Sequence, residues 1–244
     1  MFSARNALIA FLLSVLAVSS VWSFTLEPMT AQLAPSGEKS IATFRVDNDG
    51  PSKIAIRFRV LSRGVAVDGT ETNAPADELF AVYPARALVE PGRFATVKIQ
   101  WRGTASPERE QCFRFVAEQV PVDADQESAA GLRILFRYIA SVYVSEAAFA
   151  PALEVIARPS SDQSGKEGVS VEISNRGTRH VVAKDLTVDL SFAGGGSYRL
   201  SAAELGAFGN FNFLPGCSVR GFVPVREKLP DGPYAGSLKY ESEQ

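Results

Sequence analysis

The strongest constraint on the fold of this chain is an alternation of apolar and polar residues with a period of two, which recurs along most of the sequence after residue 24. Residues 42–47 and 54–60 both alternate in this way, and the turn-forming sequence Asn-Asp-Gly-Pro at 48–51 separates them. This pattern is typical of strands with one buried face, and stretches with the 3.6-residue periodicity of an amphipathic helix are scarce. The sequence therefore predicts an all-β protein.

Seven such segments occur within about 120 residues, and seven strands are typical of an immunoglobulin-type sandwich. The strands are expected at residues 24–33, 42–47, 54–60, 79–83, 95–101, 113–117 and 132–144. The pattern then restarts after a short Pro-containing segment at 147–151. Further strands are expected at residues 153–156, 169–173 and 186–192. We therefore predict two β-sandwich domains, one at residues 24–146 and a smaller one at residues 147–244.

The first 23 residues have the features of a secretory signal peptide. Arg5 is their only charged residue, residues 7–18 are almost entirely apolar, and small residues precede Phe24. The apolar stretch is shorter than the roughly 20 residues that span a bilayer, and no basic cluster follows it. We therefore expect export to the periplasm with cleavage after Ser23, and no stable membrane insertion.

Charge and composition argue against several functional classes. Lys and Arg number 25 against 27 Asp and Glu, so the chain has no excess of positive charge with which to bind nucleic acid. One histidine and two cysteines cannot form a closed zinc site without carboxylates, so we expect no metal and no other cofactor. Whether Cys112 and Cys217 pair depends on their distance, which the sequence leaves open.

Candidate catalytic groups are equally sparse. The chain has no G-x-S-x-G motif that would pair with its one histidine, His180. Glu108 and Glu110 are spaced like an acid–base pair, but they stand in a polar loop that is typical of solvated charges. We therefore expect no enzymatic activity.

The segment 132–144 is unusual because it has strand character over thirteen residues, whereas strands commonly run five or six. Its longer apolar face carries Leu132, Ile134, Phe136, Tyr138 and Ala140. At the edge of a sheet such a strand would expose unpaired backbone groups beside apolar side chains, and a partner chain would be needed to cover them. A central strand buried on both faces would give the same apolar run, so both interpretations remain open here.

The order of several short motifs resembles the PapD-like periplasmic chaperones of the chaperone–usher pathway, which assemble pili in Gram-negative bacteria. The motifs lie at residues 24–27, 37–40, 44–48, 79–84, 88–92 (Leu-Val-Glu-Pro-Gly), 113–121 and 131–144. The resemblance covers residues 24–145 well, and the second domain only in length and character.

This resemblance implies two immunoglobulin-like domains set in an L. It also implies that the last strand of the first domain lends alternate apolar residues to a pilin subunit, which the chaperone then delivers to an outer-membrane usher. The donor residues would be Leu132, Ile134 and Phe136, with Tyr138 and Ala140 as extensions. Which subunit is served, and whether two idle chains cap each other as a homodimer, remain open.

The sequence departs from the family where the terminal carboxylate of the subunit is held. Family members carry an arginine in the first strand and a lysine in the seventh, but this chain has Thr30 and Ser141 there. This departure suggests the divergent, archaic-type branch. Arg86, Lys98 and Arg137 are candidate replacements, because a carboxylate shielded from water needs a charge-assisted donor, although each is also the kind of residue that usually lies solvated at the surface.

The alternative function is an exported immunoglobulin-like binding module for sugar or protein, with no chaperone role. Such a module would share the fold and the signal peptide. It has no need of a long apolar edge strand, so the segment 132–144 is the feature that favours the chaperone.

Overall fold

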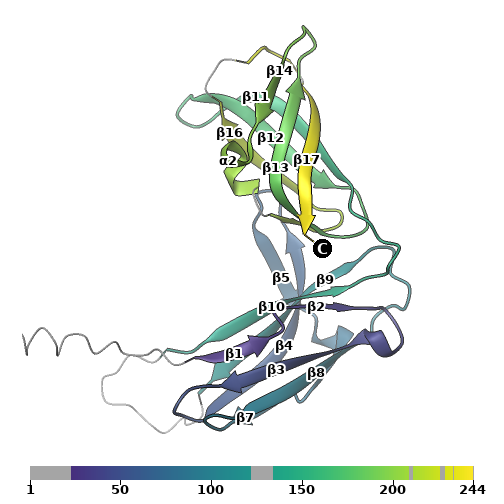
Figure 1. The fold of residues 1–244 in the computed structure, drawn as a ribbon, viewed down its shortest axis with the longest axis vertical. Coiled ribbons are helices and arrows are strands. Elements are labelled where there is room, and N and C mark those ends of the chain that lie inside the picture. Colours follow the sequence, from purple (N-terminus) through teal and green to yellow (C-terminus); the bar gives the residue numbers. More distant parts are fainter. Residues whose placement is uncertain (1–22, 122–133, 209–210, 226–228, 233, 244) are drawn as a thin grey trace, which may run out of the picture.

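The alternating segments form two β-sandwiches, which Figure 1 shows meeting at an angle, as the two arms of an L. The computed structural model describes residues 23–121, 134–208, 211–225, 229–232 and 234–243. The expected signal segment, apart from Ser23, lies outside the described residues, as does Leu132. Within the described part of the chain, no helix is long and apolar enough to cross a membrane.

The first sandwich consists of two sheets. One sheet has the order β1 (Phe24–Glu27), β3 (Ile41–Asn48), β8 (Phe94–Trp101) and β6 (Phe80–Tyr83). The other has the order β2 (Thr30–Leu33), β10 (Arg137–Val144), β9 (Gln111–Val120), β4 (Ile54–Val65) and β5 (Glu71–Pro75), and β7 (Arg86–Val89) also pairs with β4. Short 3₁₀ turns lie at η1 (Glu38–Ser40) and η2 (Asp77–Leu79). The inward residues of both sheets fill the core, in which Phe115 stacks on Phe44 with 4.3 Å between ring centroids.

The second sandwich is smaller. One sheet has the order β11 (Leu153–Ser161), β12 (Glu167–Asn175) and β16 (Ser218–Pro224). In the other, β13 (Val181–Ser191) pairs with β14 (Ser197–Leu200), β15 (Asn212–Phe213) and β17 (Ala235–Glu243). A helical turn, α2 (Ala202–Leu205), leads into η3 (Gly206–Phe208). The prediction of an all-β chain with two sandwiches is confirmed, and the three glycines at 194–196 form the turn between β13 and β14.

The first sandwich has more strands than predicted, because one predicted strand is a pair and another is followed by a strand that was not expected. Residues 24–33 divide into β1 and β2, which pair with β3 in one sheet and with β10 in the other. The strand predicted at residues 79–83 matches β6, which pairs with β8, and the unpredicted strand β7 follows it and pairs with β4. Proline cannot donate to a strand ladder, and Pro28 and Pro84 stand between β1 and β2 and between β6 and β7, where the chain passes from one sheet to the other. The expected count of seven strands was therefore too low.

The predicted thirteen-residue strand is also shorter than expected. The strand β10 begins at Arg137, and residues 134–136 precede it without strand structure. The cause is the neighbouring strand, because β9 ends at Val120 and Pro121 has no backbone N–H to continue the ladder. The last bond on this side joins the Gln119 N–H to the Phe136 carbonyl at 2.9 Å.

A buried hydrogen bond between Glu110 and His180 joins the two sandwiches. The Glu110 side chain is completely buried, and its Oε1 lies 2.5 Å from His180 Nδ1 and accepts the His180 backbone N–H at 3.0 Å. Burial alone would raise the pKa of Glu110, but the hydrogen bonds and charge of His180 outweigh burial and hold this pKa below its usual value. The interpretation of Glu110 as a solvated charge was therefore wrong, because contacts with the second sandwich enclose it.

We predict that His180→Ala lowers the free energy of unfolding by about 3 kcal/mol at pH 7, because it leaves the buried Glu110 carboxylate without the imidazole that forms a hydrogen bond with it. Burial then raises the pKa of Glu110 above its unfolded value, so the deficit should shrink as the pH falls and the carboxyl group takes up a proton. Urea denaturation of the wild type and the variant at several pH values measures the effect.

The double variant Glu110→Gln, His180→Ala serves as the control, and it should be more stable at pH 7 than His180→Ala alone. A His180→Ala protein within 0.5 kcal/mol of the wild type at pH 7 would contradict the assignment.

Candidate functional site

The free edge of β10 is the most unusual feature of the first sandwich. Along residues 141–144, β10 has β9 on one side and the parallel strand β2 on the other, with Ser141 opposite Thr30. Along residues 137–140, β9 is its only partner among the described strands. The segment is therefore an edge strand over residues 137–140 and a central strand over residues 141–144, so each of the two interpretations holds for one half.

Large apolar side chains accompany this free edge. Ile134 is 52% exposed, and Leu135 and Ile139 are 45% and 40% exposed. Phe136 is partly buried against the core of the first sandwich, and Tyr138 packs edge-on against Phe24 with 4.7 Å between ring centroids. Single exposed apolar residues are common on protein surfaces. A group of them beside backbone N–H and C=O groups that have no strand partner indicates a binding site for another chain.

The start of this segment also borders a cavity. The cavity has a volume of about 310 Å³ and lies at the open end of the first sandwich, where Ile134 and Phe136 face Phe24 and Ile54. Further along the predicted donor row the side chains turn inward, and Ala140 is completely buried in the core. Exposure along the row thus falls from Ile134 to Ala140.

A cluster of arginines lies beside the paired residues Thr30 and Ser141. Arg114 donates from Nη1 to Ser141 Oγ at 2.6 Å, and its Nε and Nη2 both bind the Glu71 carboxylate. Arg63 donates to the same carboxylate at 2.8 Å and to the Tyr143 hydroxyl at 3.0 Å.

Although burial opposes it, the hydrogen bond from Arg114 and the charges of both arginines lower the pKa of Glu71 to about 2. Arg63, Glu71 and Arg114 therefore form an ionised cluster, which carries one net positive charge beside Ser141.

The sequence-predicted cations lie elsewhere. Lys98 is exposed on β8, in the opposite sheet. Arg86 on β7 and Arg137 at the start of β10 share the sheet of Ser141 but stand in a different cross-strand row. The cation that contacts Ser141 is Arg114, which was not one of the three candidates from the sequence. The sequence offered one signal for it: Arg114 lies between the inward-facing Phe113 and Phe115, as a residue on the outer face must.

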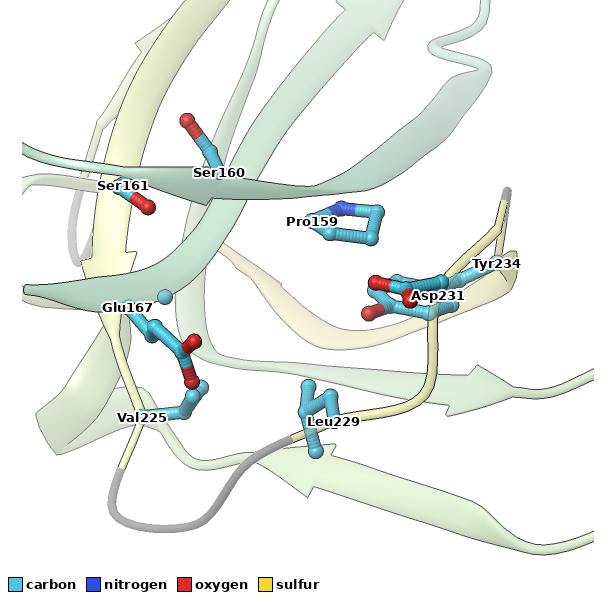
Figure 2. A pocket seen from close by; sticks show the side chains of 9 residues that line it. Pro159, Ser160, Ser161, Glu167, Val225, Leu229, Asp231 and Tyr234 are labelled. Carbon is cyan, nitrogen blue, oxygen red and sulfur yellow. The ribbon is translucent and has the colours of Figure 1, made fainter.

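Other cavities do not assemble catalytic groups. A cavity of about 430 Å³ between the sandwiches has both cysteines, Cys112 and Cys217, in its lining, and both are free thiols. Burial raises the pKa of each thiol, which disfavours the reactive thiolate. A third cavity, of about 240 Å³, lies in the second sandwich. Figure 2 shows its lining side chains, which include Asp231 and Tyr234 but neither histidine nor cysteine. No group of three potential metal ligands occurs among the residues that the structure describes.

Residues 26–144, which span the first sandwich, match the family model for the pili and flagellar-assembly chaperone, PapD N-terminal domain. The first sandwich belongs to this family. The free edge of β10 is thus the edge of a PapD-like domain. No curated protein sequence matches the chain.

Solved structures of fimbrial chaperones are similar across both sandwiches. The class 5 fimbriae chaperone CfaA is 15% identical with a TM-score of 0.56, and the match covers 91% of this chain and 100% of that one. A chain from the CsuC–CsuE chaperone–tip adhesion subunit complex of archaic Csu pili from Acinetobacter baumannii is 12% identical with a TM-score of 0.52, covering 82% and 89%. A chain from the SafA pilin–SafB chaperone complex of Salmonella enterica is 15% identical with a TM-score of 0.52, covering 85% and 86%. At these identities the likeness establishes the fold.

Proposed function

We propose that this protein is a periplasmic chaperone that binds pilus subunits by strand addition along β10. The observation that carries the proposal is the free edge of β10 at residues 137–140, flanked by exposed apolar side chains, in a domain of the PapD family. Solved complexes of structurally similar proteins, including SafB with the SafA pilin, support the same function. The proposal includes export through residues 1–23 and delivery of the subunit to an outer-membrane usher.

The subunit would gain two kinds of contact. Its backbone would bond to the unpaired groups of residues 137–140, and its open groove would receive Ile134, Phe136 and Tyr138, with Leu132 as a further donor. Burying a large apolar side chain contributes about 1.5–3 kcal/mol, so two or three such residues supply much of the binding free energy. Ala140 already belongs to the chaperone's own core, so its side chain would not enter the groove of the subunit. Its backbone would help to set the register in which the subunit strand pairs with β10.

The terminal carboxylate of the subunit would bind at the cluster of Arg63, Glu71 and Arg114. In the family a basic pair holds this carboxylate, and here Thr30 and Ser141 leave Arg114 as the cation closest to that position. The side chain of Arg114 is 19% exposed, so a ligand can still reach its guanidinium from the face of the sheet. The residue that binds the terminal carboxylate of the subunit would then lie on β9 and not on the first and seventh strands, as it does in the family.

The same edge would also allow two idle copies of the chain to cap each other as a homodimer. In the absence of a subunit, Ile134, Leu135 and Ile139 would stay in water, and a second copy of the chain could cover them. The function requires no catalytic group and no cofactor. A binding module for sugar or protein remains the second candidate, but such a module does not need a free strand edge beside apolar residues.

We predict that Ile134→Arg reduces subunit capture at least a hundredfold, because an unpaired guanidinium would be buried in the apolar groove of the subunit at a cost of several kcal/mol. The fold should be retained, since Ile134 is 52% exposed in the free protein. Native mass spectrometry of the protein purified from periplasm measures the fraction that carries a β-rich subunit at a one-to-one ratio.

The matched control is Ile156→Arg on β11, which is 47% exposed and lies in the second sandwich, and it should capture the subunit normally. Phe44→Arg, by contrast, should unfold the first sandwich because Phe44 is completely buried. Equal capture by Ile134→Arg and Ile156→Arg would contradict strand donation, as would unfolding of the Ile134→Arg variant.

We predict that Arg114→Gln weakens subunit binding tenfold to a hundredfold, because a charge-assisted hydrogen bond to the terminal carboxylate contributes about 1.5–3 kcal/mol. Arg114→Lys should recover part of this loss, since it restores the charge without the bidentate geometry. Urea-induced dissociation of the purified complex compares the variants. Full affinity in Arg114→Gln would show that the carboxylate binds elsewhere.

A further inference from the structure

A row of arginines crosses the outer face of the sheet that contains β10. Arg86 on β7, Arg57 on β4, Glu118 on β9 and Arg137 on β10 are direct register partners, so their side chains lie side by side across four strands. Strands lie about 4.8 Å apart, and the row therefore extends about 14 Å. We call these four residues the arginine row.

Glu118 is the only carboxylate among the four residues of the arginine row. Arg57 Nη2 donates to Glu118 Oε2 at 2.7 Å, and this hydrogen bond is the main cause of the lowered pKa of Glu118, with smaller contributions from the charges of Arg57, Arg137 and Arg59. Within the described part of the chain, Arg86 has no ion-pair partner. The row thus carries two net positive charges on a protein whose formal net charge is −2.

Two features of the row are unfavourable in the free protein. Arg57 and Arg86 are like charges directly opposite each other on adjacent strands, which destabilises a sheet. The Nε atom of Arg57 is buried and has no hydrogen-bond partner, which costs the desolvation of a donor. Arg57, Arg59 and Arg86 also line a cavity of about 410 Å³, in which Asp77, 3.8 Å from Arg59, is the only acidic residue of the lining.

An anionic group seated in this cavity would relieve both costs. It would separate the charges of Arg57 and Arg86 and could accept the unpartnered Arg57 N–H. The row ends at Arg137, the first residue of the free edge of β10. The body of a protein that adds a strand at this edge would therefore lie next to the row. The Coulomb attraction between the row and acidic groups would also favour one orientation of that protein on the sheet.

We propose that the arginine row binds acidic side chains on the body of the same subunit that pairs with β10. This inference rests on the proposed function, and it adds a chemical requirement to the subunit: aspartate or glutamate residues on the surface that faces the sheet. The row therefore acts as a second, electrostatic contact beside the apolar groove contact and apart from the carboxylate anchor at Arg114.

The first test uses a hexaglutamate peptide as the probe. Titration at low salt should shift the NMR signal of Arg57 Nε–Hε, and Arg86→Glu should weaken peptide binding at least tenfold. Glu118→Gln should strengthen it, because the row then keeps its full positive charge. The matched control is Arg158→Glu on β11, an exposed arginine of the second sandwich, which should leave peptide binding unchanged. Equal binding by all three variants and the wild type would overturn the proposal.

The second test uses the subunit complex purified from periplasm. Arg86→Glu should capture less subunit than Arg158→Glu, and the difference should disappear at high salt because screening removes the electrostatic contact. If Arg86→Glu loses the peptide but captures the subunit normally, the row binds anions but not the subunit, and the proposal fails. In that case Ile134→Arg would still lose the subunit, so strand donation would stand. If Ile134→Arg also captured the subunit normally, the proposed function itself would fail.

Discussion

The backbone hydrogen bonds of β10 determine the rest of the arrangement. Along residues 141–144 these bonds are satisfied on both sides, by β9 and by β2. Along residues 137–140 they are satisfied by β9 alone, and before residue 136 the ladder stops because β9 ends at Val120 and Pro121 has no backbone N–H. Unpaired strand edges favour association with another chain. The switch of the first strand from one sheet to the other sets where this edge begins, since β2 starts only at Thr30.

The free edge and the junction of the two sandwiches are connected through one short network. Tyr143 of β10 stacks on His180 with 3.8 Å between ring centroids, and its hydroxyl accepts hydrogen bonds from Arg63 and from Asn212 of the second sandwich. Arg63 in turn binds Glu71, which binds Arg114 beside Ser141. The angle between the sandwiches and the position of the arginine cluster therefore depend on the same contacts, which gives the second sandwich a structural role in presenting the edge.

Much of this could be predicted from the sequence, and the failures have physical causes. Period-two alternation located most strands and the two sandwiches, because alternation reports which side chains face a core. It cannot report pairing, so it missed the sheet switches at Pro28 and Pro84 and extended β10 past the end of its partner strand. It also did not point to the cluster of Arg114, Arg63 and Glu71, because these residues come from three strands and only the strand register brings them together. Glu110 was misjudged because the residues that bury it are distant in the sequence.

Amide hydrogen exchange along β10, followed by NMR in the free protein and in the subunit complex, tests strand addition most directly. The Ser141 N–H bonds to Met29 on the β2 side, so by alternation the N–H groups of Arg137 and Ile139 point to the free edge. Strand addition predicts fast exchange of the Arg137 and Ile139 amides in the free monomer and strong protection in the complex, with Val142 and Val144 protected in both. Unchanged exchange at Ile139 upon subunit binding would contradict the account.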